Sequence, residues 1–304
     1  MSARHICILG GSGFVGRHLL ARLRLDGHRL KILTRSERTS ARLFRQISAE
    51  AVVIDVYNQA LLEQQFAGCD TVINLIGILN ERGHDGSEFQ RVHAALPAGI
   101  ARAAQAAGVT RLLHMSALGA APDAPSLYLQ TKSMGNDALT QVLGNALAWT
   151  IFKPSVIFGP GDGLTCRFQA LLKITPFVFP LACPQARFAP VYVGDVVEAF
   201  ARSLDDARSH GQYYELCGAD LFTLQEIVEL TAHTARLKRK IIPLSDRLSR
   251  LQAEIMEYLP GKPFSRDNYL STRQDSVCSG KLAGLGALGV EPTPMNKAVA
   301  TYLA

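Results

Sequence analysis

Short apolar runs alternate with segments whose apolar residues recur at helical spacing through the first two thirds of the chain. A short apolar run bounded by glycine or polar residues is typical of a buried parallel strand, whereas a period near 3.6 indicates a helix. We expect strands at residues 6–9, 29–34, 51–56, 71–77 and 111–116, and helices at 17–23, 61–66 and 89–107. The alternation predicts an α/β fold with a doubly wound parallel sheet.

A glycine cluster joins the first strand to the first helix: Gly10-Gly11-Ser12-Gly13-Phe14-Val15-Gly16. Glycine allows a positive φ and a close approach of backbone to a diphosphate, and the helix that follows directs free N–H groups at that anion. Strand, glycine turn and helix together predict a Rossmann dinucleotide site. Two registers fit, one starting at Gly11 and one at Gly10, and the turn alone does not decide between them.

The ends of the next strands favour a particular cofactor. Arg35 follows the second strand, where an acidic residue would bind a ribose 2′-hydroxyl and an arginine accommodates a 2′-phosphate. This favours NADP over NAD, although Arg35 at a strand end also fits a merely solvated position. Asp55 follows the third strand and is placed to accept from the adenine amino group, and Gly77 leaves room for the nicotinamide half.

Three residues carry the candidate chemistry. Tyr128 and Lys132 are four residues apart on a predicted helix and therefore share one face. A neighbouring ammonium favours tyrosinate, so we expect Lys132 to lower the pKa of Tyr128 toward a range useful for proton transfer. Ser116 ends the fifth strand, at the sheet edge where α/β proteins bind ligands. The three residues favour the register Gly10, Gly13, Gly16.

Composition narrows the class of protein. With 304 residues, 48% hydrophobic and 19% charged, the chain is typical of soluble globular proteins. The net charge of +6 is concentrated in residues 17–45, which hold eight arginines and one lysine against Asp26 and Glu37. We interpret this cluster as a solvated helix face with a phosphate-binding corner, because it lacks the repeated interleaving of aromatic residues that base stacking requires. We expect no nucleic-acid partner.

The six cysteines form no C-x-x-C pair, which predicts buried thiols in a reducing cytoplasm and neither a disulfide framework nor a metal site. Arg4 and His5 precede an apolar run of only four residues, so we expect no signal peptide, and no stretch reaches the roughly 20 apolar residues of a membrane span. We therefore expect a cytoplasmic protein without a transmembrane segment.

The last third determines specificity. Residues 164–189 are apolar with three prolines; they either face a substrate cleft, implying an apolar substrate such as an isoprenoid or quinone, or pack on the core, which we favour. Residues 246–259 form an amphipathic helix that we expect in the core of a C-terminal lobe, with docking on a membrane surface as the alternative. We divide the chain into a dinucleotide-binding core (1–160), a cleft insert (161–189), a return to the core (190–238) and a small, mainly helical substrate lobe (239–304).

These motifs together resemble the extended or atypical branch of the short-chain dehydrogenase/reductase superfamily, and more narrowly the group of the nucleotide-binding accessory subunit of respiratory complex I. The resemblance implies that Tyr128 is the acid/base, that Lys132 holds the nicotinamide ribose and that Ser116 steadies the substrate. The residues expected to bind the cofactor are Gly10, Ser12, Gly13, Phe14, Val15, Gly16, Arg35, Asp55, Val56, Leu75, Ile76, Gly77, Lys132, Pro154, Ser155, Val156 and Ile157.

The chain departs from the family pattern at two positions: His93 stands where asparagine is usual, and Lys153 stands where arginine is common. The first departure puts an asparagine-dependent proton relay in doubt. Three functions remain open: an NADP(H)-dependent oxidoreductase of carbonyl or alcohol substrates, a cofactor-bound scaffold or assembly factor for a respiratory or quinone-biosynthesis complex, and an NAD-dependent sugar-nucleotide epimerase or dehydratase.

Overall fold

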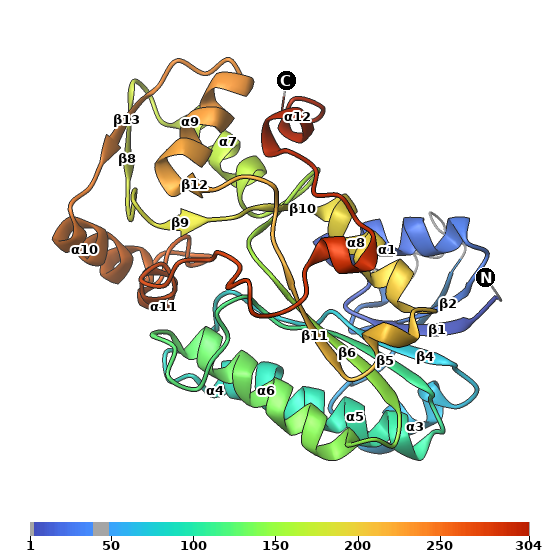
Figure 1. Cartoon of the computed structure of the whole chain (residues 1–304). Helices are drawn as coiled ribbons and strands as arrows, with labels where there is room; N and C mark the ends of the chain where they lie inside the picture. The colour runs from blue at the N-terminus through green and yellow to red at the C-terminus, as the bar shows by residue number, and fades with distance from the viewer. Residues whose placement is uncertain (1–2, 39–48, 304) are drawn as a thin grey trace. The chain divides into compact units, whose positions relative to one another are not determined.

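The computed structural model describes residues 3–38 and 49–303 (Figure 1). Arg42 and Arg45 of the arginine cluster lie outside the described residues. The chain folds as two units. The first comprises Met1–Ala117, Thr131–Lys153 and Val197–Tyr214, and the second comprises Leu118–Gln130, Pro154–Val196 and Glu215–Ala304.

A seven-stranded sheet of order β11-β6-β5-β4-β1-β2-β3 forms the centre of the first unit. Its strands are β1 (His5–Leu9), β2 (Arg29–Thr34), β3 (Glu50–Val53), β4 (Thr71–Asn74), β5 (Arg111–Met115), β6 (Ala148–Pro154) and β11 (Gln212–Leu216). The pairs from β3 through β6 are parallel. The order 3-2-1-4-5-6 is that of a Rossmann sheet, so the predicted fold class is confirmed. Strand order reverses between β1 and β4, where such sheets bind ligands.

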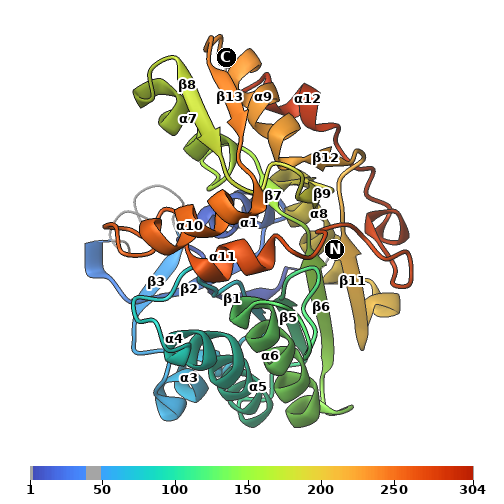
Figure 2. The same cartoon turned by 90° about the vertical axis from the view of Figure 1, so that its left-hand side faces the viewer.

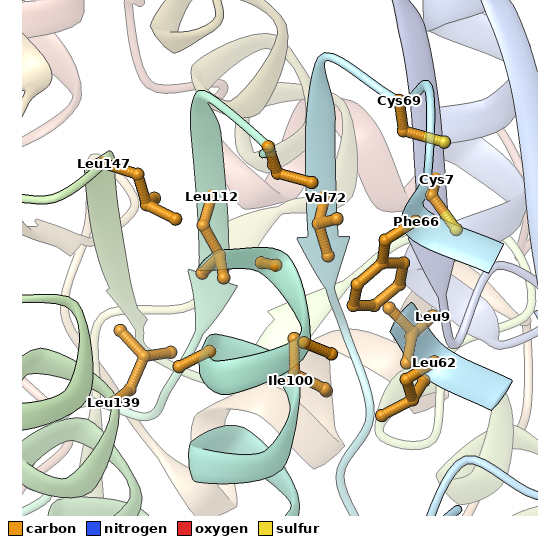
Figure 3. Close-up of a cluster of buried hydrophobic side chains, with 14 of the residues drawn as sticks. Cys7, Leu9, Leu62, Phe66, Cys69, Val72, Ile100, Leu112, Leu139 and Leu147 are labelled. Atoms are coloured by element: carbon orange, nitrogen blue, oxygen red, sulfur yellow. The ribbon is translucent and has the colours of Figure 1, made fainter. Parts of the chain in front are cut away.

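Helices cover both faces of this sheet (Figures 1 and 2). One face is covered by α3 (Gln59–Phe66), α5 (Leu96–Ala106) and α6 (Leu127–Leu143), and the other by α1 (Phe14–Leu25) and α8 (Val193–Ser203). Figure 3 shows Phe66, Ile100 and Leu139 of the first face packed toward strand residues such as Val72 and Leu112. Each buried side chain of this size contributes about 1.5–3 kcal/mol.

We expected one regular helix before β5, but the segment consists of three pieces. These are α4 (Ser87–Phe89), the π-helical η1 (Gln90–Ala95) and α5. Pro97 explains the change, because it lacks the N–H that would pair with the His93 carbonyl in an α-helix. Gly135 of α6 packs directly on that carbonyl, and a Cβ at position 135 would overlap its oxygen. The segment ends as predicted at Gly108, whose φ is +73°.

The second unit contains the remaining elements. Its helices are α7 (Thr165–Ile174), α9 (Leu224–Thr234), α10 (Asp246–Met256), α11 (Arg266–Ser271) and α12 (Met295–Val299), with the 3₁₀ turn η3 (Leu285–Leu288). Its short strands pair as β7 (Ile157–Phe158) with β10 (Val191–Tyr192), β9 (Arg187–Phe188) with β12 (Phe222–Thr223), and β8 (Val178–Leu181) with β13 (Lys240–Pro243). A second 3₁₀ turn, η2 (Ala207–Ser209), belongs to the first unit. A capping box between Thr223 and Glu226 opens α9, as the sequence predicts.

The prediction that all six cysteines are free thiols is wrong for two of them. Cys217 and Cys278 form a disulfide across 61 residues, with their Cα atoms 6.0 Å apart. The fold brings the end of β11 beside the C-terminal segment, where the Glu215 carboxylate accepts hydrogen bonds from the backbone and hydroxyl of Ser279. Cys7 and Cys69 are buried thiols, as expected.

The amphipathic helix α10 also differs from expectation. Its apolar residues Leu248, Leu251 and Ile255 are about half exposed, and its buried positions are the small residues Ser249 and Ala253. The expected packing of the apolar stripe into the lobe core is therefore wrong. Within the described part of the chain, no helix is long and apolar enough to span a bilayer.

Candidate functional site

The turn between β1 and α1 is built by three glycines. Gly10 has a φ of +81°, and its carbonyl accepts a hydrogen bond from the Gly13 N–H at 3.0 Å. A Cβ at Gly16 would overlap the Gly10 carbonyl oxygen and lie 2.6 Å from the Gly11 Cα. The left-handed residue of this turn is Gly10 and not Gly11, which fits the expected register Gly10, Gly13, Gly16.

This turn fits a diphosphate. Helix α1 begins after Gly13, which offers no side-chain acceptor, and its first turn contains no acidic residue. The helix N-terminus therefore keeps its N–H groups and its partial positive charge for an anion. Ser12, Phe14 and Val15 are only partly buried around this turn. A bound NAD(P) would be held here by backbone rather than by charged side chains.

The candidate adenosine end lies at the neighbouring strand ends. Arg35 follows β2 and is exposed; Asp55 follows β3, is exposed, and accepts from the Tyr57 N–H at 3.0 Å, while Val56 is buried. Because Thr34 of β2 pairs with Val53 of β3, Arg35 and Asp55 are at the same edge of the sheet.

Glu88 also belongs to this region. Hydrogen bonds from the backbone and guanidinium of Arg82 lower the pKa of the Glu88 carboxyl, and the charge of Arg35 adds to the effect. Arg35 therefore faces one carboxylate whose charge is already paired with Arg82. This leaves its guanidinium suited to a phosphate.

At the ends of β4 and β5 the structure brings Gly77, Lys132 and Ser116 together. The Lys132 ammonium donates to the Met115 carbonyl at 3.2 Å and would lie 3.0 Å from a Cβ at Gly77. Burial lowers the pKa of Lys132 to about 8. The Ser116 N–H donates to the Phe152 carbonyl at 2.7 Å, but its buried hydroxyl has no partner among the described residues. An orphaned buried hydroxyl points to a ligand.

The backbone after β4 is held in place from both sides. The Leu75 N–H donates to the Leu9 carbonyl at 2.9 Å, and the Ile76 N–H donates to the Asn74 side-chain oxygen at 3.1 Å. Leu75 and Ile76 are half-buried, and Gly77 is exposed. The segment that we expect beside the nicotinamide thus has a fixed path.

His93 also holds the segment after β4 in place. Its Nε2 accepts from the Ile78 N–H at 3.0 Å, and its Nδ1 lies 3.2 Å from the Thr131 hydroxyl. Burial, then the charges of Lys132 and His114, lower the pKa of His93 to about 2. Because Nε2 is an acceptor, the proton of the neutral ring is on Nδ1. Both nitrogens are engaged, so His93 positions the loop and α6 and does not relay protons.

A second buried histidine, which the strand pattern did not single out, lies on β5. The Asn74 amide donates to Nδ1 of His114 at 3.0 Å. Burial, then the charge of Lys132, lower the pKa of His114 to about 3. Its buried Nε2 meets no hydrogen-bonding group in the described part of the chain. Two neutral histidines therefore lie near the Lys132 ammonium.

Tyr128 is the second residue of α6, one turn before Lys132, so the two side chains share a helix face. The backbone N–H groups of Leu127 and Tyr128 donate to the Asp267 carboxylate at 2.7 and 3.2 Å. Burial, then the charge of Asp267, raise the pKa of Tyr128 to about 12. The prediction that Lys132 lowers the pKa of Tyr128 is thus wrong. No sequence signal marked Asp267, which the structure places against the first turn of α6.

The remaining expected cofactor residues belong to the second unit. Pro154 ends β6, Val156 follows one residue later, and Ile157 begins β7. The Ser155 hydroxyl donates to the Ser276 carbonyl at 2.7 Å, and its N–H donates to the Leu216 carbonyl at 2.9 Å. Ser155 thus holds the C-terminal segment in place.

A sheet of this order with a glycine turn at its switch point defines an NAD(P)-binding protein of the Rossmann class. The family described as NAD(P)H-binding matches residues 10–167. The chain belongs to this family and resembles the group of the complex I accessory subunit as well as reductases of the short-chain dehydrogenase type.

Two relatives illustrate the range of the family. The chain is 28% identical over 263 residues to NADH dehydrogenase [ubiquinone] 1 alpha subcomplex subunit 9, mitochondrial, of Arabidopsis thaliana; the match covers 84% of this chain and 64% of that protein, just under two thirds. It is 31% identical over 251 residues to a ceramide reductase of Caulobacter vibrioides, covering 79% of this chain and 74% of that protein.

Solved structures show the same fold. UDP-glucose 4-epimerase of Thermotoga maritima, solved with UDP-glucose, superimposes with a TM-score of 0.76 at 14% identity, covering 98% of this chain and 97% of that chain. At this identity the likeness concerns the fold alone.

Proposed function

We propose that the protein is an NADP(H)-dependent reductase that interconverts a carbonyl and an alcohol. The observation that carries the proposal is the buried, unpartnered hydroxyl of Ser116 beside the Lys132 ammonium at the ends of β4 and β5. Such a hydroxyl suits a substrate oxygen better than a core position, because a buried polar group without a partner costs about 1–3 kcal/mol. The bound cofactor would supply or accept the hydride.

Each polar residue then has a distinct task. Ser116 donates a hydrogen bond to the substrate oxygen and orients it. Tyr128, whose pKa is about 12, is protonated at neutral pH and so serves as the proton donor in the reductive direction. Lys132, whose pKa is about 8, is largely charged at neutral pH and stabilises a nearby ribose hydroxyl and the phenolate that forms.

We further propose that the carbonyl is attached to a long apolar chain. This adopts the cleft-facing alternative for the apolar, proline-containing segment 164–189 in place of the core packing that the sequence favoured. Two relatives support it by name: the ceramide reductase, and a ketoreductase of Stigmatella aurantiaca that acts on a farnesyl-bearing dihydroquinoline oxide, 25% identical over 171 residues and about half of each chain.

The test is NADPH oxidation by the purified full chain with matched ketones of short and long alkyl chain. We expect turnover with the long-chain ketones at a kcat/KM at least about ten-fold above the short-chain ones, because each buried methylene adds about 0.8 kcal/mol. Cofactor that co-purifies, identified by mass spectrometry, should be NADP(H). Binding of NADP(H) without turnover of any ketone in the series would contradict the proposal.

A cofactor-bound scaffold is the second candidate, and the Arabidopsis thaliana relative named as a complex I subunit favours it. The two candidates differ in their need for Tyr128. A scaffold keeps its cellular function when the phenol is removed, whereas a reductase does not.

Arg35 supplies the expected preference for NADP. Replacing Arg35 with alanine should weaken NADPH binding about ten-fold and leave NADH binding unchanged, since one charge-assisted contact to a phosphate contributes about 1.5–3 kcal/mol before solvent screening at this exposed site. Fluorescence titration of both reduced cofactors measures the change. The matched control is Arg29→Ala, an exposed arginine at the opposite end of β2, the strand that Arg35 follows. An unaltered ratio of the two dissociation constants would show that Arg35 does not read the phosphate.

A further inference from the structure

The turn from α7 into β8 exposes three apolar side chains in the second unit. Ile174 ends α7 with 78% of its surface exposed, Phe177 follows with 83%, and Val178 begins β8 with 44%. We call these three residues the α7 tip. Leu172 before the turn and Phe179 after it are buried in the core of the unit. The core therefore stops on both sides of the turn, and the α7 tip lies outside it.

The backbone fixes the α7 tip in this exposed position. Phe177 has a φ of +58°, a left-handed conformation that is unfavourable for a bulky residue. Its carbonyl accepts from the Lys240 N–H at 2.9 Å, and the Val178 N–H donates to the Pro176 carbonyl at 2.6 Å. Val178 is also paired in register with Lys240, because β8 and β13 lie side by side (Figures 1 and 2). The fold thus holds an aromatic ring in solvent at the expense of local strain.

A basic segment lies against the α7 tip. Four of the five residues from 236 to 240 are basic: Arg236, Lys238, Arg239 and Lys240. The Arg239 Nε–H donates to the carbonyls of Leu172 and Thr175 at 3.0 and 2.7 Å, and so caps the C-terminal end of α7. Together with the pairing of Lys240 and Val178, these bonds place the positive charge of the segment beside the exposed apolar side chains.

This positive charge is not neutralised by nearby acidic residues. Residues 164–189 and 230–245 contain no aspartate or glutamate. The preceding acidic residue, Glu229 of α9, accepts from the Gln225 amide at 2.8 Å. The ion pairs that the structure describes in the second unit join other side chains. The basic residues that are exposed around the α7 tip are Lys173, Arg236, Lys238 and Lys240.

We propose that the α7 tip inserts into an anionic lipid bilayer, with residues 236–240 at the lipid headgroups. Aromatic and apolar side chains flanked by lysine and arginine are typical of segments that lie in a membrane interface, and a cluster of four basic residues attracts anionic lipids. Side chains as exposed as Ile174 and Phe177 have little protein beside them. A fluid bilayer surrounds such side chains, whereas a protein partner needs a matching pocket.

A second copy of the chain fits the α7 tip poorly, because it would bring two clusters of like charge together. Docking on a bilayer needs neither a cofactor nor turnover, so it is independent of the proposed reductase activity.

Vesicle co-sedimentation of the full chain tests the docking. We expect binding to vesicles of phosphatidylcholine mixed with phosphatidylglycerol, weaker binding to phosphatidylcholine alone, and loss of binding as salt is added. Ile174→Gln combined with Phe177→Asn should weaken binding at least about ten-fold, and asparagine tolerates the left-handed backbone at position 177. The matched control is Leu251→Ser on α10, a half-exposed leucine in a segment, 246–262, with three basic and three acidic residues.

Lys238→Glu combined with Lys240→Glu provides a second, independent variant. We expect it to remove the preference for anionic vesicles while circular dichroism stays unchanged, because both side chains are exposed. Equal vesicle binding by the wild type and the Ile174/Phe177 variant would overturn the proposal. Absence of wild-type binding to anionic vesicles would also overturn it, in favour of a protein partner. A wild-type dimer that the Ile174/Phe177 variant converts to a monomer would assign the α7 tip to a second copy instead.

Discussion

Replacing Tyr128 with phenylalanine should lower kcat/KM for carbonyl reduction about 100- to 10,000-fold, because the phenol is the proposed proton donor. The NADPH dissociation constant should not change, since the substitution removes no group expected at the diphosphate or the adenosine. Initial rates of NADPH oxidation and a fluorescence titration separate the two effects. Tyr258→Phe, at an exposed tyrosine, is the control. Full turnover by the Tyr128 variant would disprove the acid/base assignment.

The pH dependence adds a second line of evidence. The pKa of about 12 keeps Tyr128 protonated, whereas the pKa of about 8 makes Lys132 lose its charge above that pH. Reduction should therefore decline above about pH 8, and alcohol oxidation, which needs a proton acceptor, should rise with pH. Asp267 raises the pKa of Tyr128, so Asp267→Asn should move the rise in oxidation to lower pH. An unmoved profile would show that Asp267 only caps α6.

Lowering the pH from 7 to 5 should reduce the unfolding free energy by about 4 kcal/mol through two buried histidines. His93 and His114 have pKa values of about 2 and 3 in the folded state, against an ordinary value of 6.5. Between these limits the unfolded chain binds one more proton at each ring than the folded chain does. The contribution of the two histidines to the unfolding free energy is therefore fully present above pH 6.5. Below that pH it falls by about 1.4 kcal/mol per histidine for each pH unit.

Denaturant unfolding at the two pH values measures this loss. Trp149 lies in the same unit and is the one tryptophan of the sequence, so its fluorescence reports the relevant part of the molecule. His93→Gln should reduce the pH-dependent loss by about half, whatever it does to stability at pH 7. His84→Gln, at an exposed loop position, is the control. If the two variants lose stability equally between pH 7 and pH 5, the histidines do not govern acid sensitivity.

Local signals made much of the first unit predictable. The apolar runs define buried strands, and a parallel sheet joined by helices follows from their alternation. Gly10, Gly13 and Gly16 were identified because a turn with positive φ and tight packing admits no larger residue. The Tyr128–Lys132 spacing was readable because four residues make about one turn of helix.

The disulfide, the role of Asp267 and the orientation of α10 could not be predicted, because they depend on contacts between segments that are distant in the sequence. Nothing near Cys217 in sequence indicates Cys278, and nothing near Tyr128 indicates Asp267, yet each pair meets in the fold. The pattern of α10 correctly predicted an amphipathic helix but not which side faces outward. That choice rests on the bonds of Ser249 and Tyr269, which no periodicity records.

The π-helical turn also constrains how this sequence can diverge. Pro97 has no N–H to donate to the His93 carbonyl, and Gly135 gives that carbonyl room on the neighbouring helix. A larger residue at 135 would therefore force the His93 carbonyl to move. The imidazole that holds the loop after β4 depends on the same turn. A side chain added at position 135 would thus act on the loop after β4, although the two do not touch, through the turn that carries His93.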